Sequence, residues 1–287
     1  MEAKPKILVT GANGQLGKEL KQLESQYHQF EFIFLSREDL PIHHFELVRN
    51  FFKGYYPQYL INCAAYTAVD RAETEKDLAF QVNGEAVGVL AAVCKEYGTR
   101  FLHISTDYVF DGTATTPYKE DAPTNPQSVY GASKLEGEKE ALHFNPDSII
   151  IRTSWVYSEF GRNFVKTMMK LMGEKDQLYV VNDQIGSPTY AADLADVIMQ
   201  IISSGKWSRG IYHFSNEGVI SWFDFAVAIQ DMTGSNCKVS AIPTTSYPTP
   251  AKRPVYSVLD KSKIAATFGI TPKDWKDSLR SCLNRLK

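Results

Sequence analysis

A tyrosine and a lysine four residues apart are the first feature of this sequence that could do chemistry. Tyr130 and Lys134 occur in VYGASKLEGEK, which has the spacing YxxxK. If the segment is helical, residues four apart share one face, so the ammonium lies near the phenol. A free tyrosine has a pKa of about 10, and a nearby cation lowers it, which eases proton exchange with a substrate. The pair predicts a proton-transfer site, although a lone YxxxK also occurs by chance in many helices.

A hydroxyl group that could hold a carbonyl oxygen precedes this pair. Thr106 lies in HISTDYVFDG, directly after a predicted strand at 100–105. Ligands of open parallel sheets bind beyond the carboxyl ends of the strands, so Thr106 would sit at the mouth of the site. There its hydroxyl can bond the oxygen of a carbonyl that becomes an alcohol. A helix cap or turn is the alternative for Thr106. His103 is interpreted as a core histidine and receives no role.

The third chemical feature is a glycine-rich turn, TGANGQLG at 10–17. It lies between the first predicted strand and the first predicted helix. Glycine permits a tight turn and lets the backbone approach a pyrophosphate, and the helix N-terminus offers unpaired amides with a partial positive charge. The turn therefore predicts a dinucleotide site, with an ordinary strand-to-helix turn as the alternative.

The residues that follow the second strand bear on the choice of dinucleotide. That strand ends at Leu35-Ser36-Arg37. An acidic side chain here favours a free ribose 2′-hydroxyl, whereas a basic one tolerates a 2′-phosphate. Arg37 therefore favours NADPH over NADH, with Glu38 beside it as an offsetting charge.

These features need a sheet that brings strand ends together. Apolar runs predict buried parallel strands at 6–10, 30–35, 59–65, 100–105 and 148–152. Helical spacing follows the turn to about residue 24 and recurs at 45–53 and 78–97, where Gly98 would stop the last helix. This alternation predicts an α/β fold with a Rossmann-like, doubly wound parallel sheet.

The second half of the chain is less regular and predicts a smaller lobe. Prolines punctuate it, and PTTSYPTPAKRP at 243–254 cannot be regular structure. We predict a dinucleotide-binding domain at 1–152, to which 176–216 partly returns. Residues 153–287 would mainly form a C-terminal substrate-binding lobe over the strand ends.

Composition excludes several other classes of protein. The 287 residues carry a net charge of −2, so the chain has no basic field for nucleic acid. Its four cysteines are scattered without a CxxC pair, which argues against zinc and against a disulfide scaffold, and we predict no metal ligands. The chain shows no signal peptide and no apolar run of the roughly 18 residues that a membrane span needs, so a cytoplasmic protein without membrane partners is predicted.

Taken together, the motifs resemble the extended short-chain dehydrogenase/reductase superfamily, and within it the dTDP-4-dehydrorhamnose reductase family. The resemblance covers almost the whole chain. It is carried by TGANGQLG at 10–17, NCAAYTAVDRAE at 62–73, VN at 82–83, STDYVFDG at 105–112, YGASKLEGE at 130–138, RTSWVY at 152–157, NDQIGSPTY at 182–190 and RPVYSVLD at 253–260.

That family reduces the C4 ketone of dTDP-4-dehydro-L-rhamnose to dTDP-L-rhamnose with NADPH or NADH. The resemblance implies that Thr106, Tyr130 and Lys134 are catalytic, with Tyr130 as the proton donor. Tyr130 and Lys134 would also touch the cofactor, together with Gly11, Asn13, Gly14, Gln15, Leu16, Ser36, Arg37, Ala64, Ala65 and Tyr66. A dTDP-sugar would lie against Val69, Thr106, Tyr108, Trp155, Asn163 and Gln184.

Two positions of the family pattern need separate mention. Where the family usually has an aspartate in a pattern like LDITD, this chain has LPIHH at 40–44, near the expected adenine. Some relatives bind magnesium through acidic residues at a dimer contact, and Glu19 and Asp193 fall at the matching positions. The resemblance therefore raises a homodimer and a magnesium ion, for which a solvated surface is the alternative.

Two other functions fit parts of the pattern. A nucleotide-sugar epimerase or dehydratase of the same superfamily would regenerate its cofactor, but the Thr106-Asp107 pair differs from the Asp-Glu arrangement of the dehydratases. A non-catalytic protein like the regulatory β-subunit of methionine adenosyltransferase shares STDYVFDG-like sequence. Such a protein would bind a partner enzyme instead of turning over a sugar.

Overall fold

The first strand forms from an apolar run that is buried on both faces. In the computed structural model, which describes residues 3–286, β1 (Lys6–Thr10) pairs in parallel with β2 (Glu31–Leu35) and β3 (Tyr59–Asn62). β4 (Arg100–Thr106), β5 (Ile149–Thr153) and β10 (Gly210–His213) extend the sheet in the order β10-β5-β4-β3-β1-β2, with every pair parallel. The predicted doubly wound parallel sheet is confirmed. The strand order reverses beside β1, where such sheets bind ligands.

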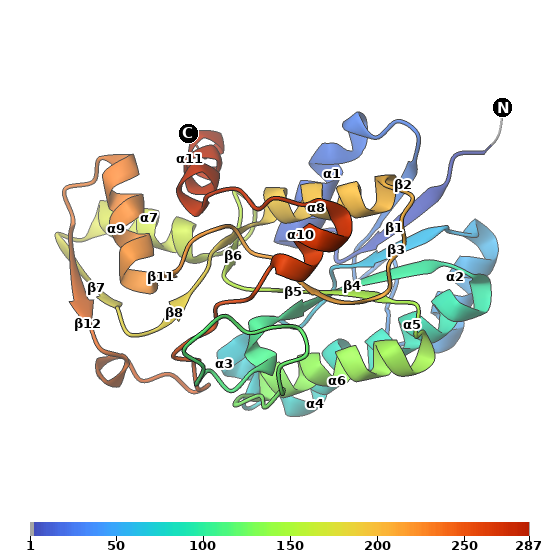
Figure 1. Cartoon of the computed structure of the whole chain (residues 1–287), viewed down its shortest axis with the longest axis horizontal. Helices are drawn as coiled ribbons and strands as arrows, with labels where there is room; N and C mark the ends of the chain where they lie inside the picture. Colours follow the sequence, from blue (N-terminus) through green and yellow to red (C-terminus); the bar gives the residue numbers. More distant parts are fainter. Residues whose placement is uncertain (1–2, 287) are drawn as a thin grey trace.

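Helices cover both faces of this sheet because alternate strand residues point to opposite sides. Ile7 and Val9 pack toward α1 (Gln15–Leu23) and α8 (Ala191–Ser203). Leu8 packs on the other face with α2 (Phe45–Tyr55) and α5 (Ala86–Tyr97), beside which lies α6 (Val129–Phe144). Figure 1 shows α1 and α8 above the sheet and α5 and α6 below it.

Some element boundaries differ from the prediction. The third strand ends at Asn62 and not at Ala65, because the side chain of Asn62 accepts hydrogen bonds that turn the chain out of the sheet. The expected helix at 78–97 begins as α4 (Lys76–Phe80) and passes through a π-helical turn, η2 (Gln81–Glu85), before α5. Gly98 ends it with a φ of 67°, as predicted.

The helical stretch Lys76–Tyr97 is, by length and composition, long and apolar enough to cross a membrane. It corrects the prediction that the chain has no apolar run of the length that a membrane span needs. Its apolar side chains belong to the core: 56% of the most apolar window is buried, and Val87, Leu90 and Val93 pack under the sheet. Burial inside the protein explains this composition.

A second lobe has its own core. α7 (Phe164–Glu174), α9 (Trp222–Thr233) and α11 (Trp275–Arg285) surround Phe225 and pack near β7 (Gln177–Val181), which pairs in parallel with β12 (Lys238–Ile242). Figure 1 shows this lobe to the left of the sheet. Two short pairs, β6 (Val156–Tyr157) with β9 (Thr189–Tyr190) and β8 (Ile185–Gly186) with β11 (Ile220–Ser221), add Tyr157, Tyr190 and Ile220 to this second core.

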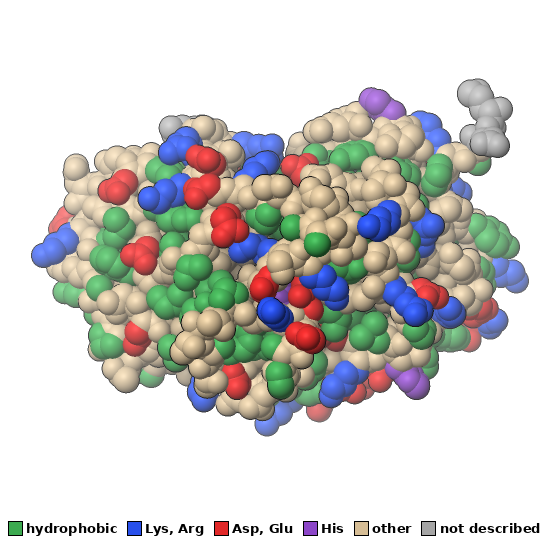
Figure 2. Space-filling view, viewed as in Figure 1, with side chains coloured by type: hydrophobic (Ala, Val, Ile, Leu, Met, Phe, Trp, Pro, Cys, Tyr) green, Lys and Arg blue, Asp and Glu red, His purple; other side chains and the backbone are tan. Residues whose placement is uncertain are grey.

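The chain crosses between the lobes more than once. After β7, α8 and β10 join the first sheet, and later α10 (Ser262–Phe268) packs beside β10. Residues 243–254 contain one 3₁₀ turn, η4 (Thr244–Ser246), and are otherwise irregular. On the face in Figure 2, acidic and basic side chains are interspersed.

Candidate active site

The glycine turn after β1 has a shape that only glycine allows. Gly11 has a φ of +69°, and a Cβ there would lie 2.6 Å from the amide nitrogen of Ala64. A Cβ on Gly17 would lie 2.7 Å from the Cα of Ala12. Gly14 is the N-cap residue of α1 and has no side chain. No side-chain cap therefore accepts a hydrogen bond from the first amides of this helix. The residues fit a dinucleotide pyrophosphate, since close backbone approach and unpaired amides are what such a group needs.

The other predicted residues of the turn divide into exposed and internal groups. Asn13 and Gly14 are exposed, whereas Leu16 is 8% exposed and packs in the core. Leu16 can therefore offer only its backbone. Gln15 accepts a hydrogen bond from Asn163 Nδ2 at 2.9 Å, which ties the turn to the second lobe.

The end of β2 presents a positive charge beside the turn. Ser36 Oγ accepts from the amides of Glu38 and Asp39, which shapes the loop, and Arg37 is exposed. The amide of Ala12 donates to the carbonyl of Leu35, so this loop lies next to the glycine turn. The pKa of His43 is lowered by burial, by His44 and by the nearby Arg37. The lowered pKa leaves the His43 ring uncharged near neutral pH, so the positive charge at the end of β2 belongs to Arg37.

Thr106 ends β4 at the edge where the strand ends meet. It is 5% exposed, and its hydroxyl donates to Asp107 Oδ1 at 2.9 Å and accepts from the amide of Tyr108 at 3.2 Å. Asp107 begins the 3₁₀ turn η3 (Asp107–Val109), and its Oδ2 is buried without a hydrogen-bond partner. Burial raises the pKa of Asp107 to about 6, although hydrogen bonds with Thr106 and Ser257 act to lower it.

Tyr130 lies in the first turn of α6, which Ser128 caps by accepting from the amide of Gly131 at 3.1 Å. Its ring meets that of Tyr108 edge-on, with centroids 5.5 Å apart. Burial raises the pKa of Tyr130 above its ordinary value, and the hydroxyl of Thr106 acts in the opposite direction. The phenol is therefore protonated, as a proton donor must be.

Burial dominates the pKa of Tyr130, so the net lowering that YxxxK predicts is not observed in this structure. The Nζ atom of Lys134 points toward the sheet, where it donates to the carbonyl of Ile104 at 2.6 Å and lies 3.3 Å from His103 Nε2. Lys134 is 2% exposed. Burial lowers its pKa to about 8, although Glu138 and Cys63 act in the opposite direction.

The loop after β3 brings further predicted residues to the same edge. Ala64 and Ala65 are half-buried, and the amide of Tyr66 donates to Asn83 Oδ1 at 2.8 Å. Asn83 also donates to the carbonyl of Tyr66 and to Ser133 Oγ, so the π-helical turn fixes this loop against α6. Val69 begins α3 (Val69–Ala72) and is half-buried.

An arginine from the second lobe closes over this region. Arg253 donates to the hydroxyl of Tyr108 at 3.1 Å and to Asp70 Oδ2 at 2.7 Å. Asp70 also accepts from the amide of Ala251. The irregular segment 243–254 is therefore anchored to α3 directly beside Tyr108.

Trp155 has an unusual backbone for a large residue, with a φ of +48°. Its ring stacks on Trp222 with centroids 3.6 Å apart. A Cβ at Gly186 would lie 2.6 Å from the Trp155 ring, so that glycine leaves room for the indole. Strain of this kind costs on the order of 1–3 kcal/mol and tends to gather at functional sites.

Asn163 and Gln184 are held by protein groups. Asn163 caps α7 through its Oδ1, while its Nδ2 donates to Gln15 and to the carbonyl of Ser158. Gln184 is 8% exposed and donates to Thr244 Oγ1 at 3.0 Å. Both side chains brace the walls of the site in this structure.

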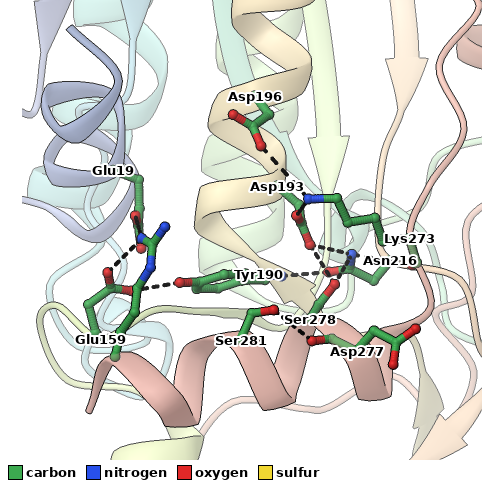
Figure 3. A network of polar contacts seen from close by, with 11 residues as sticks. Glu19, Glu159, Tyr190, Asp193, Asp196, Asn216, Lys273, Asp277, Ser278 and Ser281 are labelled. Atoms are coloured by element: carbon green, nitrogen blue, oxygen red, sulfur yellow. Dashed lines mark hydrogen bonds and ion pairs between the residues drawn. The ribbon is translucent and has the colours of Figure 1, made fainter. Parts of the chain in front are cut away.

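Glu19 and Asp193, which fall at the magnesium-binding positions of some relatives, lie in two separate polar groups (Figure 3). Asp193 accepts from Lys273 Nζ at 2.7 Å and from Ser278 and Asn216. Glu19 accepts from Ser158 at 2.6 Å, and Arg285 lies 3.6 Å from its other oxygen. A cation of the same chain therefore lies beside each of these two acidic side chains.

The neighbours of Glu19 also favour a proton over a metal. Burial and the adjacent Glu159 raise the pKa of Glu19, and hydrogen bonds from Glu19, Arg285 and Tyr190 lower that of Glu159 despite burial. Glu19 is therefore the protonated member of the pair. Within residues 3–286, no three His, Cys, Asp or Glu side chains are grouped to hold a metal. These residues do not fit magnesium.

A surface hollow lies outside the predicted site. It is lined by Phe80, Glu85, Glu136 and Glu140, between α4 and the outer side of α6. Three carboxylates make it unsuitable for the phosphates of a nucleotide. We assign the site to the strand ends.

Sequence reasoning missed the polar residues behind the catalytic ones. Asn62 donates to His103 Nδ1, and His103 touches Lys134, although the sequence reading treated His103 as a core residue only. Glu138 lies one helical turn beyond Lys134 on α6 and forms an ion pair at 2.7 Å with Arg152 on β5. Both residues are 2% exposed. Polar residues within predicted buried strands were the signal that could have found Asn62 and His103.

Comparisons with known proteins agree with this geometry. The chain matches the family model described as RmlD substrate binding domain over residues 5–287. It is 45% identical over 286 residues to the dTDP-4-dehydrorhamnose reductase of Aggregatibacter actinomycetemcomitans, covering 96% of this chain and 97% of that protein.

Solved structures give the same result. A crystal structure of a dTDP-4-dehydrorhamnose reductase from Clostridium acetobutylicum has a TM-score of 0.94 at 45% identity and covers 98% of this chain and 99% of that one. A dTDP-4-dehydrorhamnose reductase from Bacillus anthracis, in complex with NADP, has a TM-score of 0.94 at 36% identity. The match covers 99% of this chain and 100% of that one. The fold, the strand-end site and these similarities together show that the chain belongs to the dTDP-4-dehydrorhamnose reductase family of NADPH-dependent oxidoreductases.

Proposed function

We propose that this protein reduces the C4 ketone of dTDP-4-dehydro-L-rhamnose to give dTDP-L-rhamnose. The observation that carries the proposal is the meeting of Thr106 and Tyr130 at the strand ends, beside a glycine turn shaped for a pyrophosphate. The printed names of the relatives supply the substrate. When bound, NADPH supplies the hydride.

The residues of the chain supply the proton and hold the reacting oxygen. Tyr130 is protonated and gives its proton to the carbonyl oxygen as the ketone gains a hydride, so an alcohol and a phenolate result. Thr106 faces the same oxygen with its hydroxyl. In its ammonium form, Lys134 offsets the negative charge of the phenolate.

The walls of the site would bind the rest of the substrate. Arg253 lies beside Tyr108 and offers a guanidinium to the diphosphate, and the Trp155–Trp222 stack offers a flat apolar surface. Such surfaces suit the apolar face of a sugar or a base. Val69, Tyr108, Asn163 and Gln184 complete the walls in this proposal.

NADPH is the proposed cofactor in preference to NADH. Arg37 places positive charge where the second strand ends. A 2′-phosphate is favoured by such charge. The relative from Bacillus anthracis was crystallised with NADP. Homodimer formation and a cytoplasmic location stay predictions from the sequence.

One assay separates the proposed function from its alternatives. The purified chain is mixed with NADPH and dTDP-4-dehydro-L-rhamnose, and the absorbance of the reduced cofactor is followed while the sugar nucleotide is analysed. A reductase consumes equal amounts of both. Conversion of the sugar without net loss of NADPH would identify an epimerase or dehydratase. No conversion with any 4-ketosugar nucleotide would favour the regulatory-subunit hypothesis.

A further inference from the structure

A buried chain of polar side chains runs from β1 to Lys134 with a fixed direction of hydrogen bonding. Thr10 is 1% exposed, and Asn62 and His103 are fully buried. The hydroxyl of Thr10 donates to Asn62 Oδ1 at 2.7 Å, and the main-chain amide of Ala64 donates to the same oxygen at 3.2 Å. A main-chain amide can only donate, so the oxygen of Asn62 must face Ala64 and its NH₂ group must face His103.

This orientation decides where His103 carries its proton. Asn62 Nδ2 lies 3.0 Å from His103 Nδ1, and an amide NH₂ group can only donate. His103 Nδ1 therefore accepts, and the single proton of the neutral ring is on Nε2. Burial lowers the pKa of His103 well below its usual value, as does the nearby Lys134, so the ring is neutral.

The Nε2–H group of His103 is directed at Lys134. The two nitrogens are 3.3 Å apart, and Nζ also donates to the carbonyl of Ile104 at 2.6 Å. An ammonium has three donors and no lone pair, so it cannot accept a hydrogen bond from Nε2–H, whereas a neutral amine can. The contacts on the sheet side of Lys134 thus match the amine.

We propose that Asn62 and His103 are positioning residues that fix the Nε2–H tautomer, hold the Lys134 side chain against β4 and favour its neutral amine. The mechanistic consequence rests on the proposed function, in which the ammonium of Lys134 offsets the phenolate of Tyr130. If Asn62 and His103 favour the amine, turnover is limited at high pH, because fewer molecules then carry Lys134 as the ammonium.

Other charged groups around Lys134 act in both directions. Glu138, one turn further along α6, and Cys63, in the loop after β3, favour the ammonium, whereas burial favours the amine. The balance leaves Lys134 with a pKa of about 8, near which a small change in His103 has a large effect on its charge.

The tautomer can be measured without any substrate. Nitrogen NMR of protein labelled at its histidine side chains distinguishes Nε2–H, Nδ1–H and the doubly protonated ring. The His103→Gln variant assigns the signal. The expected result for the full chain is a neutral Nε2–H ring between about pH 6 and about pH 9, because the pKa of His103 lies well below its ordinary value. An Nδ1–H ring, or an imidazolium in that range, would overturn the proposal.

Substitution of Asn62 provides the second test. In Asn62→Asp, the carboxylate has no hydrogen to donate, so it accepts from His103 Nδ1–H and the ring presents a lone pair to Lys134. The tautomer should reverse, and the basic limb of the pH profile for kcat should move up by about one unit or more. A moved limb without a reversed tautomer would mean that the added charge acts alone, and would overturn the proposal.

Two histidine variants complete the design. His103→Gln can accept from Asn62 and donate to Lys134, so it should retain the wild-type basic limb. His103→Leu can do neither and should move the limb upward. His28→Gln changes an exposed histidine and serves as the control for both. Equal limbs in the Gln and Leu variants would contradict the proposal. If the wild type has the expected tautomer but shows no reductase turnover, the proposed function fails and the tautomer assignment stands.

Discussion

At the scale of single residues, the chemistry depends on a phenol that stays protonated until the substrate needs its proton. The raised pKa of Tyr130 comes first from burial, and the hydroxyl of Thr106 moderates it. The lysine expected to sit against this phenol instead reaches the backbone of β4. Residue type and spacing predicted both groups as candidates, while their mutual geometry depends on the tertiary packing around them.

Tyr130→Phe should lose most turnover and keep its affinity for NADPH. The ring still packs against Tyr108, but the proton donor is gone. Because general acid catalysis contributes about 10²–10⁴-fold, kcat should fall by that range. Steady-state kinetics and NADPH titration measure the two effects. Turnover equal to that of the wild type would refute the assignment of Tyr130 as the proton donor.

Arg37→Ser should weaken the preference for NADPH. The exposed guanidinium stands where a 2′-phosphate is expected, and loss of one such ion pair corresponds to about a tenfold rise in KM for NADPH, with little change for NADH. Arg49→Ser, which removes another exposed arginine, on α2, is the control. If both cofactors respond alike to the loss of Arg37, its predicted role in 2′-phosphate recognition is wrong.

At the scale of elements, α6 must hold Tyr130 and Lys134 at the right height above the strand ends. Arg152 on β5 donates to both oxygens of Glu138 on α6, at 2.9 and 2.7 Å, and Ser105 on β4 donates to the same carboxylate. Two charges buried to this degree are favourable only as a pair. The helix is therefore locked to two strands of the sheet.

Arg152→Met should destabilise the protein by about 3–5 kcal/mol, because it leaves a buried carboxylate without its cation. Urea unfolding measures the loss. Lys95→Met breaks an exposed pair with Asp147 and should show little change. A double variant, Arg152→Met with Glu138→Leu, should recover part of the stability. Equal stability of the Arg152 and Lys95 variants would show that the buried pair does not lock α6.

At the scale of the whole molecule, the two lobes are joined by a polar cluster of α1, β9 and α11, formed by Glu19, Glu159, Tyr190 and Arg285 (Figure 3). Tyr190 and Arg285 both donate to Glu159, and Glu19 accepts from Ser158. The cluster connects the helix that follows the glycine turn to the last helix of the chain. Arg285 and the hydrogen bond from Tyr190 hold Glu159 in this contact.

Glu19→Gln should remove a dependence of stability on pH. The folded pKa of Glu19, about 8, is raised above its usual 4.5, so the folded state binds this proton more tightly than the unfolded state. Stability from Glu19 is fully present below about pH 4.5 and is lost as pH rises toward 8. Glutamine cannot lose a proton, so the variant should gain on the order of 1–3 kcal/mol over the wild type at high pH.

Urea unfolding of both proteins across this pH range tests the expectation. Glu24→Gln, an exposed glutamate in the 3₁₀ turn η1 (Glu24–Gln26), is the control and should follow the wild type. Parallel stability curves for the wild type and Glu19→Gln would show that Glu19 does not bind its proton more tightly in the folded state.

The sequence alone determined the parts of this protein that depend on local order. The apolar run before Gly11 and the turn that follows it specify a strand, a tight bend and a helix, since each depends on neighbouring residues. The spacing of Tyr130 and Lys134 specified a shared helix, and the alternation of such segments specified a parallel sheet whose strand ends meet.

Tertiary structure decided the rest, because hydrogen bonding and burial depend on residues far apart in the chain. His103 acquires its tautomer from Asn62, which is set in turn by Thr10 and Ala64. Lys134 takes its direction from the carbonyl of Ile104 on another element. Glu19 and Asp193 meet Arg285 and Lys273 from the end of the chain, which no pattern of spacing reveals. Charge and proton positions are properties of the packed molecule, and they became definable only once the lobes were assembled.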